Sequence, residues 1–332
     1  MDEKWLVGAD IGGTTIKMAF INQNGEIIYK WEIPTNINEK GKNIPKEMAK
    51  SIDQTLSELG QEKQKLIGIG VGAPGPVNLG NGSIDVAVNL GWNNFPLKDL
   101  LEMGTSLPVI VDNDANAAAI GEMWKGAGQG SKDLLCITLG TGVGGGIISN
   151  GQIVHGINGA GGEIGHITSL VEDGAPCNCG KTGCIETIAS ATGIVRLAIE
   201  ELSFTETPSR LRDFYNEHQI LSSELVFEVA NEGDELANRV IGKVTLYLGL
   251  ALAHLANGLN PEKIIIGGGV SKAGDALLVP LKEQFTRFAF PRVLQGVELA
   301  NATLGNDAGI MGGAWLVKKR LLNRNGNTPL YL

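Results

Sequence analysis

The chain has 332 residues, 43% of them hydrophobic, and a formal net charge of −9 at pH 7. This length and composition allow one large domain or two medium ones with full cores. The absence of a run of Lys and Arg argues against a nucleic-acid-binding protein. The longest apolar stretch, 244–256, is shorter than the roughly 20 residues of a membrane span, and the first residues lack the positive region of a signal peptide. We therefore expect a soluble, cytoplasmic protein that binds neither nucleic acid nor membrane.

The N-terminal segment predicts a strand, a glycine-rich turn and a hairpin. An apolar run at 4–9 ends at Asp10, and the turn Gly12-Gly13-Thr14-Thr15 leads into a second strand-like run at 16–21. A dinucleotide-binding fingerprint needs a helix after its glycines, so the strand at 16–21 disfavours that class. A turn of Gly and Thr between two strands can still direct successive N–H groups at a phosphate.

The same layout recurs about halfway along the chain. Residues 135–139 predict a strand, Gly140 to Gly146 a turn, and the hairpin segment at 150–154 closely matches that at 24–28. This internal repeat favours two related domains that face each other across a cleft over a chance recurrence of Gly-rich hairpins. Asp10 has no counterpart in the second copy, so the turn does not need it. A metal-linked role for Asp10 is therefore favoured over capping.

Between the two copies, the chain predicts strands that end in glycine-rich or polar loops. A helix is expected at 44–60 and a strand at 66–71, which leads into the loop Gly72-Ala73-Pro74-Gly75-Pro76-Val77. This loop and Asn89 are most simply turns, and lining a ligand is the alternative.

A further strand, at 108–111, is followed by Asp112-Asn113-Asp114 and then by a helix at 115–124. Asp114 thus lies at a helix N-terminus, where Asp most often acts as a cap. The alternative is a catalytic base, because α/β proteins place ligand chemistry at strand ends. A helix N-terminus also favours the ionised carboxylate that a base requires.

The last part of the chain predicts a long helix and another strand with a glycine-rich end. Helices with polar loops are expected at 191–235, without a cluster that indicates a function, and a long helix at 235–258. A buried strand at 263–266 then leads into Gly267-Gly268-Gly269. Such a turn can admit a nucleotide base and ribose against bare backbone, but alone the signal is weak. An apolar helix is expected at 308–322.

The segment from Gly161 to Glu186 has the composition of a zinc site. It contains one His and three Cys, a common structural zinc set, at His166, Cys177, Cys179 and Cys184. Three unligated thiols are the alternative. Four protein ligands leave no open position for water, so the zinc would be structural. The carboxylates Glu163 and Glu186 flank this set, which points to a site that places polar groups on a small ligand.

Six motifs between about residues 5 and 320 appear in the order found in the ROK family (repressors, open reading frames, kinases). They are Asp10-Ile-Gly-Gly-Thr-Thr-Ile-Lys17, Gly72-Ala-Pro-Gly-Pro-Val77, Asp112-Asn-Asp-Ala-Asn116, Leu139-Gly-Thr-Gly-Val-Gly-Gly-Gly146, Glu163-Ile-Gly-His166 and Cys177-x-Cys-Gly-x-x-Gly-Cys184-x-Glu186. The chain most resembles the bacterial ATP-dependent glucokinases of that family.

This resemblance implies an actin-like, ribonuclease-H-like α/β fold of two domains, expected at 1–118 with 306–332 and at 119–305. It implies ATP-dependent phosphorylation of a hexose 6-hydroxyl, with glucose or a related hexose as substrate and Mg²⁺ as a cofactor, by a homodimer or homotetramer. By motif match, Asp114 resembles the family's catalytic base, which reverses the preference for capping.

The other matched positions divide by ligand. The sugar would be bound by Gly72, Asn89, Asn113, Asp114, Glu163, His166 and Glu186. ATP and its Mg²⁺ would be bound by Asp10, Gly12, Gly13, Thr14, Thr15, Lys17, Gly140, Thr141, Gly142, Gly267, Gly268 and Gly269. His166 would then serve both zinc and sugar, one ring nitrogen each.

There are two alternatives, and the sequence disfavours the first of them. Sugar-responsive repressors of the family carry a helix-turn-helix domain before the first phosphate motif, and only nine residues precede Asp10 here, which leaves no room for one. The second alternative is a kinase for mannose, fructose, allose or an N-acetylated amino sugar. Sequence distinguishes these substrates poorly, because the shape of the pocket around Asn89 and the Gly72 loop would decide which sugar binds.

Overall fold

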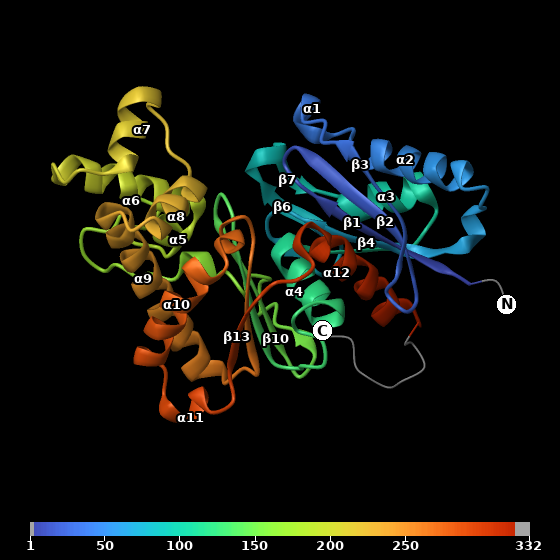
Figure 1. Cartoon of the computed structure of the whole chain (residues 1–332). Helices are drawn as coiled ribbons and strands as arrows, with labels where there is room; N and C mark the ends of the chain where they lie inside the picture. The colour runs from blue at the N-terminus through green and yellow to red at the C-terminus, as the bar shows by residue number, and fades with distance from the viewer. Residues whose placement is uncertain (1–2, 323–332) are drawn as a thin grey trace. The chain divides into compact units, whose positions relative to one another are not determined.

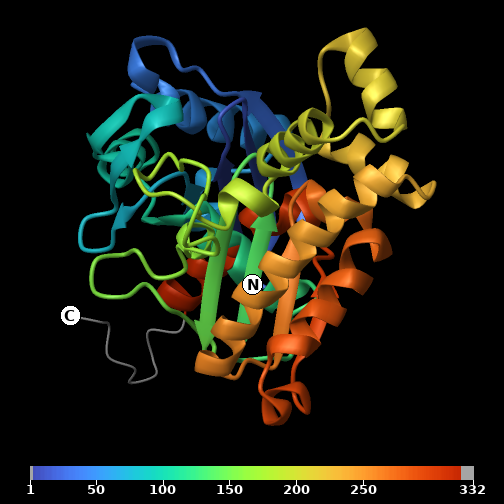
Figure 2. The same cartoon turned by 90° about the vertical axis from the view of Figure 1, so that its left-hand side faces the viewer.

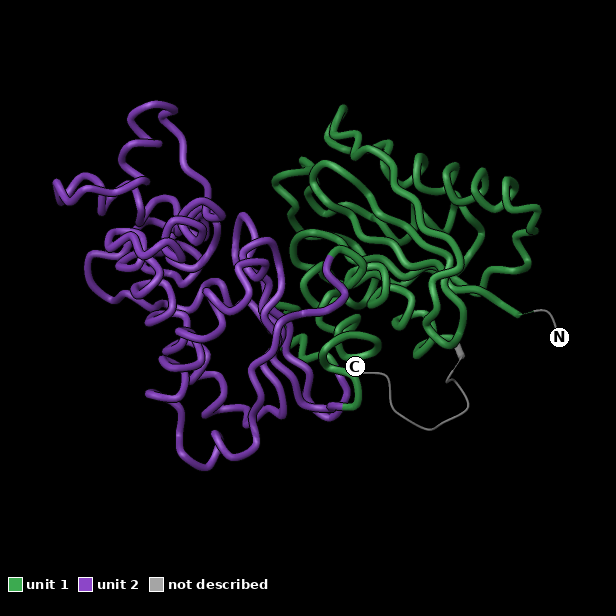
Figure 3. The backbone as a smooth tube through the Cα atoms, viewed as in Figure 1, with its two compact units in different colours: residues 1–130, 153–161, 306–332 green, residues 131–152, 162–305 purple. Residues whose placement is uncertain are grey.

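The computed structural model describes residues 3–322, which form two compact units (Figure 3). Unit 1 comprises residues 1–130, 153–161 and 306–332, and unit 2 comprises 131–152 and 162–305, in each case as far as they are described. Neither unit is continuous in sequence. The domain division expected from the sequence, 1–118 with 306–332 and 119–305, stays a prediction.

Unit 1 is built on a five-stranded sheet with the order β3-β2-β1-β4-β8. Its strands are β1 (Trp5–Ile11), β2 (Thr15–Asn22), β3 (Ile27–Pro34), β4 (Leu66–Ala73) and β8 (Val109–Asn113). The first three are antiparallel neighbours, and β4 and β8 run parallel to β1. The register pairs Asp10 with Gly72 and Gly72 with Asp112, so the carboxyl ends of three parallel strands lie side by side.

Helices cover both faces of this sheet (Figure 1). They are α2 (Ile44–Glu58), α3 (Leu97–Thr105), α4 (Asp114–Lys125) and α12 (Ala308–Val317). The segment labelled α1 (Asn38–Gly41), which precedes α2, is a short turn with positive φ at Glu39 and Lys40. In α2, the apolar residues Ile44, Met48, Ile52 and Leu56 recur every four positions and are buried against the sheet, as expected of an amphipathic helix. A small antiparallel sheet, not predicted from the sequence, adds β5 (Val77–Asn78), β6 (Ser83–Ala87) and β7 (Trp92–Phe95).

Helix α12 packs against α4 and the sheet at backbone distance. A Cβ at Gly312 would lie 1.8 Å from the Ala117 carbonyl oxygen, and one at Gly70 would lie 1.8 Å from that of Gly313. Only glycine permits such an approach, because real Cβ atoms do not come this close to other heavy atoms. Some of the 47 glycines therefore serve helix packing as well as loops. The predicted helix at 308–322 ends as a regular α-helix at Val317 and continues as a π-helical turn, Lys318–Leu322.

Unit 2 repeats the topology of unit 1. Its sheet has the order β11-β10-β9-β12-β13. The strands are β9 (Leu134–Leu139), β10 (Val143–Ser149), β11 (Gln152–Ile153), β12 (Lys263–Gly267) and β13 (Glu298–Asn301). An antiparallel hairpin is again followed by two parallel strands, which confirms the internal repeat.

The core of unit 2 lies between this sheet and a group of helices. They are α5 (Glu186–Ala189), α6 (Ala191–Phe204), α7 (Arg210–His218), α8 (Ser223–Asn231), α9 (Glu235–Leu259), α10 (Asp275–Phe288) and α11 (Pro291–Leu294). Helix α9 lies beside α10 against the strands (Figure 2). By length and composition alone α9 could cross a membrane, but 56% of its most apolar window is buried within the protein, as in a core helix.

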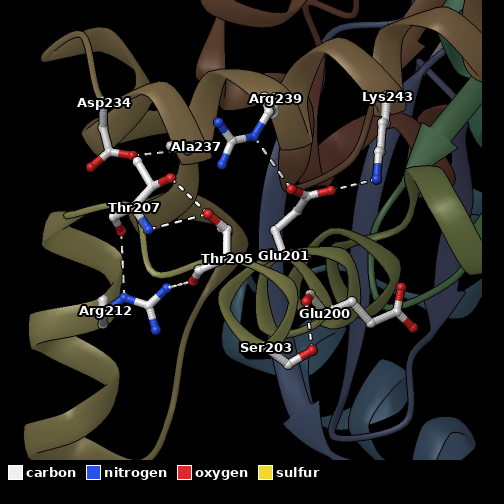
Figure 4. Close-up of polar contacts among 10 residues, drawn as sticks. All are labelled: Glu200, Glu201, Ser203, Thr205, Thr207, Arg212, Asp234, Ala237, Arg239 and Lys243. Carbon is white, nitrogen blue, oxygen red and sulfur yellow. Dashed lines mark hydrogen bonds and ion pairs between the residues drawn. The ribbon is translucent and has the colours of Figure 1, made fainter.

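Polar contacts hold the segment at 191–235 together (Figure 4). The guanidinium of Arg212 donates to the carbonyl oxygen of Leu202 at 3.0 Å and to that of Thr205. Glu201 accepts from Lys243 and Arg239 on α9, and its hydrogen bond to Lys243 lowers the pKa of the Glu201 carboxyl. These interactions join α6 to α7 and to α9.

Candidate active site

The predicted site residues of unit 1 gather where β1, β4 and β8 end. Asp10 is cross-strand partner to Lys17 on β2. Burial, and next the charge of Asp114, raise the pKa of the Asp10 carboxyl to about 6, whereas Lys17 opposes the shift. Gly72 is buried between the two acids, since a Cβ at this position would lie 3.4 Å from Asp114 Cα and 3.6 Å from Asp10 Oδ1. Two carboxylates that repel each other thus share this end of the sheet.

The helix that follows β8 is capped by Asn113. Its side-chain oxygen accepts from the N–H groups of Ala115 at 2.9 Å and Asn116 at 3.2 Å, and its amide nitrogen donates to the Gly75 carbonyl oxygen at 3.2 Å. Asn113 is thus the N-cap, and Asp114 shares in the cap, since its Oδ1 also accepts from the Ala115 N–H, at 2.8 Å. Asp114 is the first residue of α4 and is only half-buried, so its carboxylate stands at the positive end of the helix.

A hydrogen bond between a buried carboxyl group and a histidine supports this strand end. Asp112 is 3% exposed, and its Oδ2 lies 2.8 Å from His155 Nε2. Its Oδ1 accepts from the Asn113 N–H at 2.8 Å and from Asn116 Nδ2 at 3.1 Å. No partner for His155 was apparent from the sequence, because residues 43 positions apart carry no local signal of their contact.

The first predicted phosphate loop, 12–15, closes on itself and leaves its centre exposed. The Gly12 N–H donates to the Thr15 carbonyl oxygen at 3.1 Å, and the Thr35 hydroxyl donates to the Gly12 carbonyl oxygen at 2.7 Å. Gly13 and Thr14 are exposed. Asn89 lies next to this loop, since a Cβ at Gly13 would lie 3.4 Å from its Nδ2.

In unit 2 the four predicted metal ligands come together. The ligand atoms of His166, Cys177, Cys179 and Cys184 all lie within 4.8 Å of one another. Cys177 Sγ is 3.6 Å from His166 Nδ1, and Cys179 Sγ is 3.6 Å from Cys184 Sγ. Ligands about 2.0 to 2.3 Å from a tetrahedral zinc have similar separations. The donor set and its spacing therefore fit a closed, four-coordinate zinc ion.

Two carboxylates flank this cluster, as the sequence predicted. Glu163 Oε2 lies 3.8 Å from His166 Nε2, and Glu186 Oε1 lies 3.8 Å from Cys177 Sγ. Because Nδ1 of His166 faces the thiols, Nε2 is the ring nitrogen turned toward Glu163. The three predicted sugar ligands of unit 2 are thus neighbours of the metal cluster.

The remaining predicted residues form two turns of unit 2. In the second phosphate loop the Gly140 N–H donates to the Gly142 carbonyl oxygen at 2.9 Å, and Thr141 is exposed. Gly267 ends β12, and the exposed Gly268, with φ +83°, and Gly269 lead into a 3-10 turn, Val270–Ala273. A cavity of about 750 Å³ between α2 and α3, bordered by Lys42, Lys46 and Met103, includes none of the predicted site residues.

The predicted residues therefore fall into two groups, each assembled within its own unit. The strand ends of unit 1 hold Asp10, Gly72, Asn113 and Asp114 beside the first predicted phosphate loop, and unit 2 holds the His/Cys cluster, its two carboxylates, the second predicted phosphate loop and the Gly267 turn.

Comparison with known proteins identifies the family. The ROK family model matches residues 6–320, and the chain therefore belongs to the ROK family. The chain is 58% identical to a glucokinase of Halalkalibacterium halodurans over 96% of this chain and 97% of that protein. It is 30% identical to a xylose repressor of Caldicellulosiruptor bescii, over 96% of this chain and 79% of that protein.

A solved ROK family glucokinase from Streptomyces griseus, in complex with glucose and AMPPNP, superimposes with a TM-score of 0.73. It is 34% identical and covers 94% of this chain and 98% of that one. Together with the duplicated sheets, this similarity confirms the predicted actin-like sugar kinase fold.

Proposed function

We propose that this chain transfers the γ-phosphoryl group of ATP to the 6-hydroxyl of glucose. The observation that carries the proposal is the 58% identity to a glucokinase over nearly the whole of both chains. The conjunction of a half-buried Asp at a strand end with two exposed Gly-Thr turns supports it independently. A kinase for another hexose is the alternative within the same chemistry.

In the proposed mechanism Asp114 is the general base. Phosphoryl transfer passes through a loose transition state, so positioning and charge neutralisation contribute more than covalent help. The N-terminus of α4 favours the ionised form of Asp114, which orients the sugar hydroxyl and accepts its proton as the O–P bond forms. The cap provided by Asn113 and the Asp112–His155 pair hold the backbone that carries this carboxylate.

The phosphates of ATP would be held by backbone N–H groups. Because the Gly12 and Gly140 N–H groups close their own turns, we assign phosphate contact to the exposed neighbours Gly13, Thr14 and Thr141. Asp10 would hold Mg²⁺, which when bound neutralises phosphate charge. The bare backbone at Gly268 and Gly269 would accept the adenosine.

The zinc cluster would act as a structural brace for the sugar ligands. Glu163, His166 and Glu186 would accept or donate hydrogen bonds to sugar hydroxyls, with His166 bound to zinc through Nδ1. A sugar that lacks one of these hydroxyls would leave one of these polar groups without its partner in the complex, and this gives specificity.

A substrate panel tests the proposal. ADP release is measured with ATP and glucose, mannose, fructose, allose or an N-acetylated amino sugar. We expect the highest kcat/KM with glucose. A higher value with another sugar would select the alternative substrate. No ADP release with any of them would favour a sugar-responsive regulator, an alternative that the 30% identity to a repressor supports. Light scattering of the same sample tests the expected homodimer or homotetramer.

A further inference from the structure

The segment after the last cysteine ligand contacts the second phosphate loop at three positions. Glu186 Oε2 accepts from the Val143 N–H at 2.9 Å. The Ala191 N–H donates to the Gly140 carbonyl oxygen at 2.8 Å, and the Thr192 hydroxyl donates to that of Thr141 at 2.9 Å. These bonds fix both ends and the centre of the turn that links β9 to β10.

The carboxylate of Glu186 lies directly beside this turn. A Cβ at Gly142 would lie 2.4 Å from Glu186 Oε2. The carboxylate therefore occupies the space beside the loop, and a side chain at position 142 would have to displace it from this orientation. A hydrogen bond to a charged acceptor in a partly buried site contributes more than a neutral one.

The other side of the same segment is attached to the metal cluster. Cys184 is two residues before Glu186, and the Ile185 N–H donates to the Ile167 carbonyl oxygen at 2.8 Å, next to His166. Glu186 Oε1 lies 3.8 Å from Cys177 Sγ. One short segment, 184–192, thus connects the cysteine loop to the phosphate loop, all within unit 2.

The two oxygens of Glu186 have different surroundings. Because Oε2 is held by the Val143 N–H, the carboxylate has a fixed orientation, and Oε1 is the oxygen left for a sugar hydroxyl. Glu163 differs in this respect, since it is exposed and its neighbour is His166.

We propose that Glu186 is a positioning residue for the nucleotide phosphates in addition to its proposed contact with sugar. The segment 184–192 holds the loop 139–143 in the conformation that receives phosphate, and the metal cluster holds the segment. The inference rests on the proposed kinase function. If the inference is right, the metal cluster affects the affinity for nucleotide as well as the affinity for sugar.

If Glu186 positions the loop, the affinity of the protein for nucleotide should depend on Glu186 even when no sugar is present. Replacing Glu186 with Ala removes the acceptor of the Val143 N–H, so we expect AMPPNP with Mg²⁺ to bind about 5- to 50-fold more weakly. Glu186→Gln keeps a carbonyl oxygen that can accept from the same N–H. It should restore most of the nucleotide affinity while glucose binding stays weak.

The matched control is Glu163→Ala, which removes the other carboxylate beside the cluster without touching the phosphate loop. We expect it to weaken glucose binding and to leave AMPPNP affinity within about twofold. Thr192→Val removes the hydrogen bond to the Thr141 carbonyl oxygen, and Thr192 is not one of the predicted sugar ligands. We expect this variant to lose less nucleotide affinity than Glu186→Ala and to bind glucose normally.

Isothermal titration calorimetry, with AMPPNP and Mg²⁺ in the absence of glucose and with glucose in the absence of nucleotide, separates these outcomes. Equal AMPPNP affinity in Glu186→Ala and Glu163→Ala overturns the inference. If Glu186→Ala does not fold, unchanged AMPPNP affinity in Thr192→Val overturns it. If the unmodified protein binds AMPPNP but phosphorylates no sugar, the proposed function fails and the inference on the loop is still decided by the variants.

Discussion

Asp10 and Asp114 place two negative charges at the ends of the strands on either side of β4, and only one of them stands at a helix N-terminus. Burial and repulsion raise the pKa of Asp10 to about 6. We assign the role of base to Asp114 because it is half-buried and stands at the N-terminus of α4, and we assign Mg²⁺ binding to Asp10, whose carboxyl is largely buried.

Replacing Asp114 with Asn tests the base directly. A positioned base typically contributes about 10²- to 10⁴-fold to the rate, and Asn cannot accept the proton. We expect kcat to fall by that factor with a small change in the KM for glucose, measured by ADP release. Asp53→Asn, on the exposed face of α2, is the control and should keep normal turnover. Near-normal turnover of the Asp114 variant would exclude it as the base.

The pKa of Asp10 predicts a pH dependence of stability. Its folded-state pKa of about 6 lies above the ordinary Asp value of 3.8, so between these values the folded state binds more protons than the unfolded state. The contribution of Asp10 to stability therefore falls as pH rises from about 4 to about 6. Urea unfolding at several pH values should show this decline in the unmodified protein and a weaker decline in Asp10→Asn. Parallel curves for both proteins would contradict the assignment.

At the scale of elements, close backbone approach fixes how α12 lies on α4. We expect Gly312→Ala to lower the free energy of unfolding by at least about 1–3 kcal/mol, because the new Cβ would lie 1.8 Å from a backbone oxygen and cores respond to overpacking at this scale.

Gly242→Ala in α9 is the matched control for this substitution. It is also a helical glycine, but it is exposed, and no heavy atom lies within 4 Å of an added Cβ. We expect it to raise stability by about 0.5–1 kcal/mol, because Ala loses less backbone entropy in a helix. Thermal and urea unfolding measure both variants. A Gly312 variant as stable as the unmodified protein would show that α12 can shift at little cost.

The proposed sugar site also depends on the conformation of the loop that carries Cys177, Cys179 and Cys184. If zinc braces it, the purified protein should contain about one zinc per chain, and Cys179→Ser should lose the metal, bind glucose more weakly and unfold at a lower temperature. Cys136→Ser is the control, since Cys136 lies in β9 and is not among the cluster residues. Metal analysis that finds no zinc in the unmodified protein would refute the metal proposal.

At the scale of the whole molecule, the chain is a duplication. Each unit joins an antiparallel hairpin to two parallel strands, and in each the first turn is a Gly-Thr loop with an exposed centre. The copies differ outside this shared part. Unit 1 has an acid-bearing strand end, and unit 2 has the cysteine cluster and the segment 184–192, which contacts the turn at 140–142. Duplication supplies two Gly-Thr turns, to which we assign phosphate binding, and the proposed chemistry and the proposed substrate selection come from what each copy added.

The sequence alone determined the features that depend on neighbours along the chain. Strands, amphipathic helices and glycine turns follow from short-range hydrophobic periodicity and backbone freedom, and the repeat and the family motifs are visible as ordered residues. The cysteine set was predicted because its spacing is short. Tertiary structure alone decided the rest. It paired His155 with Asp112, made Asn113 the N-cap of α4 with Asp114 as a second acceptor of the Ala115 N–H, and placed Glu186 on the Val143 N–H. These contacts join residues whose approach depends on the packing of whole elements, because a hydrogen bond requires positions fixed to within about an ångström, and local sequence does not encode such positions.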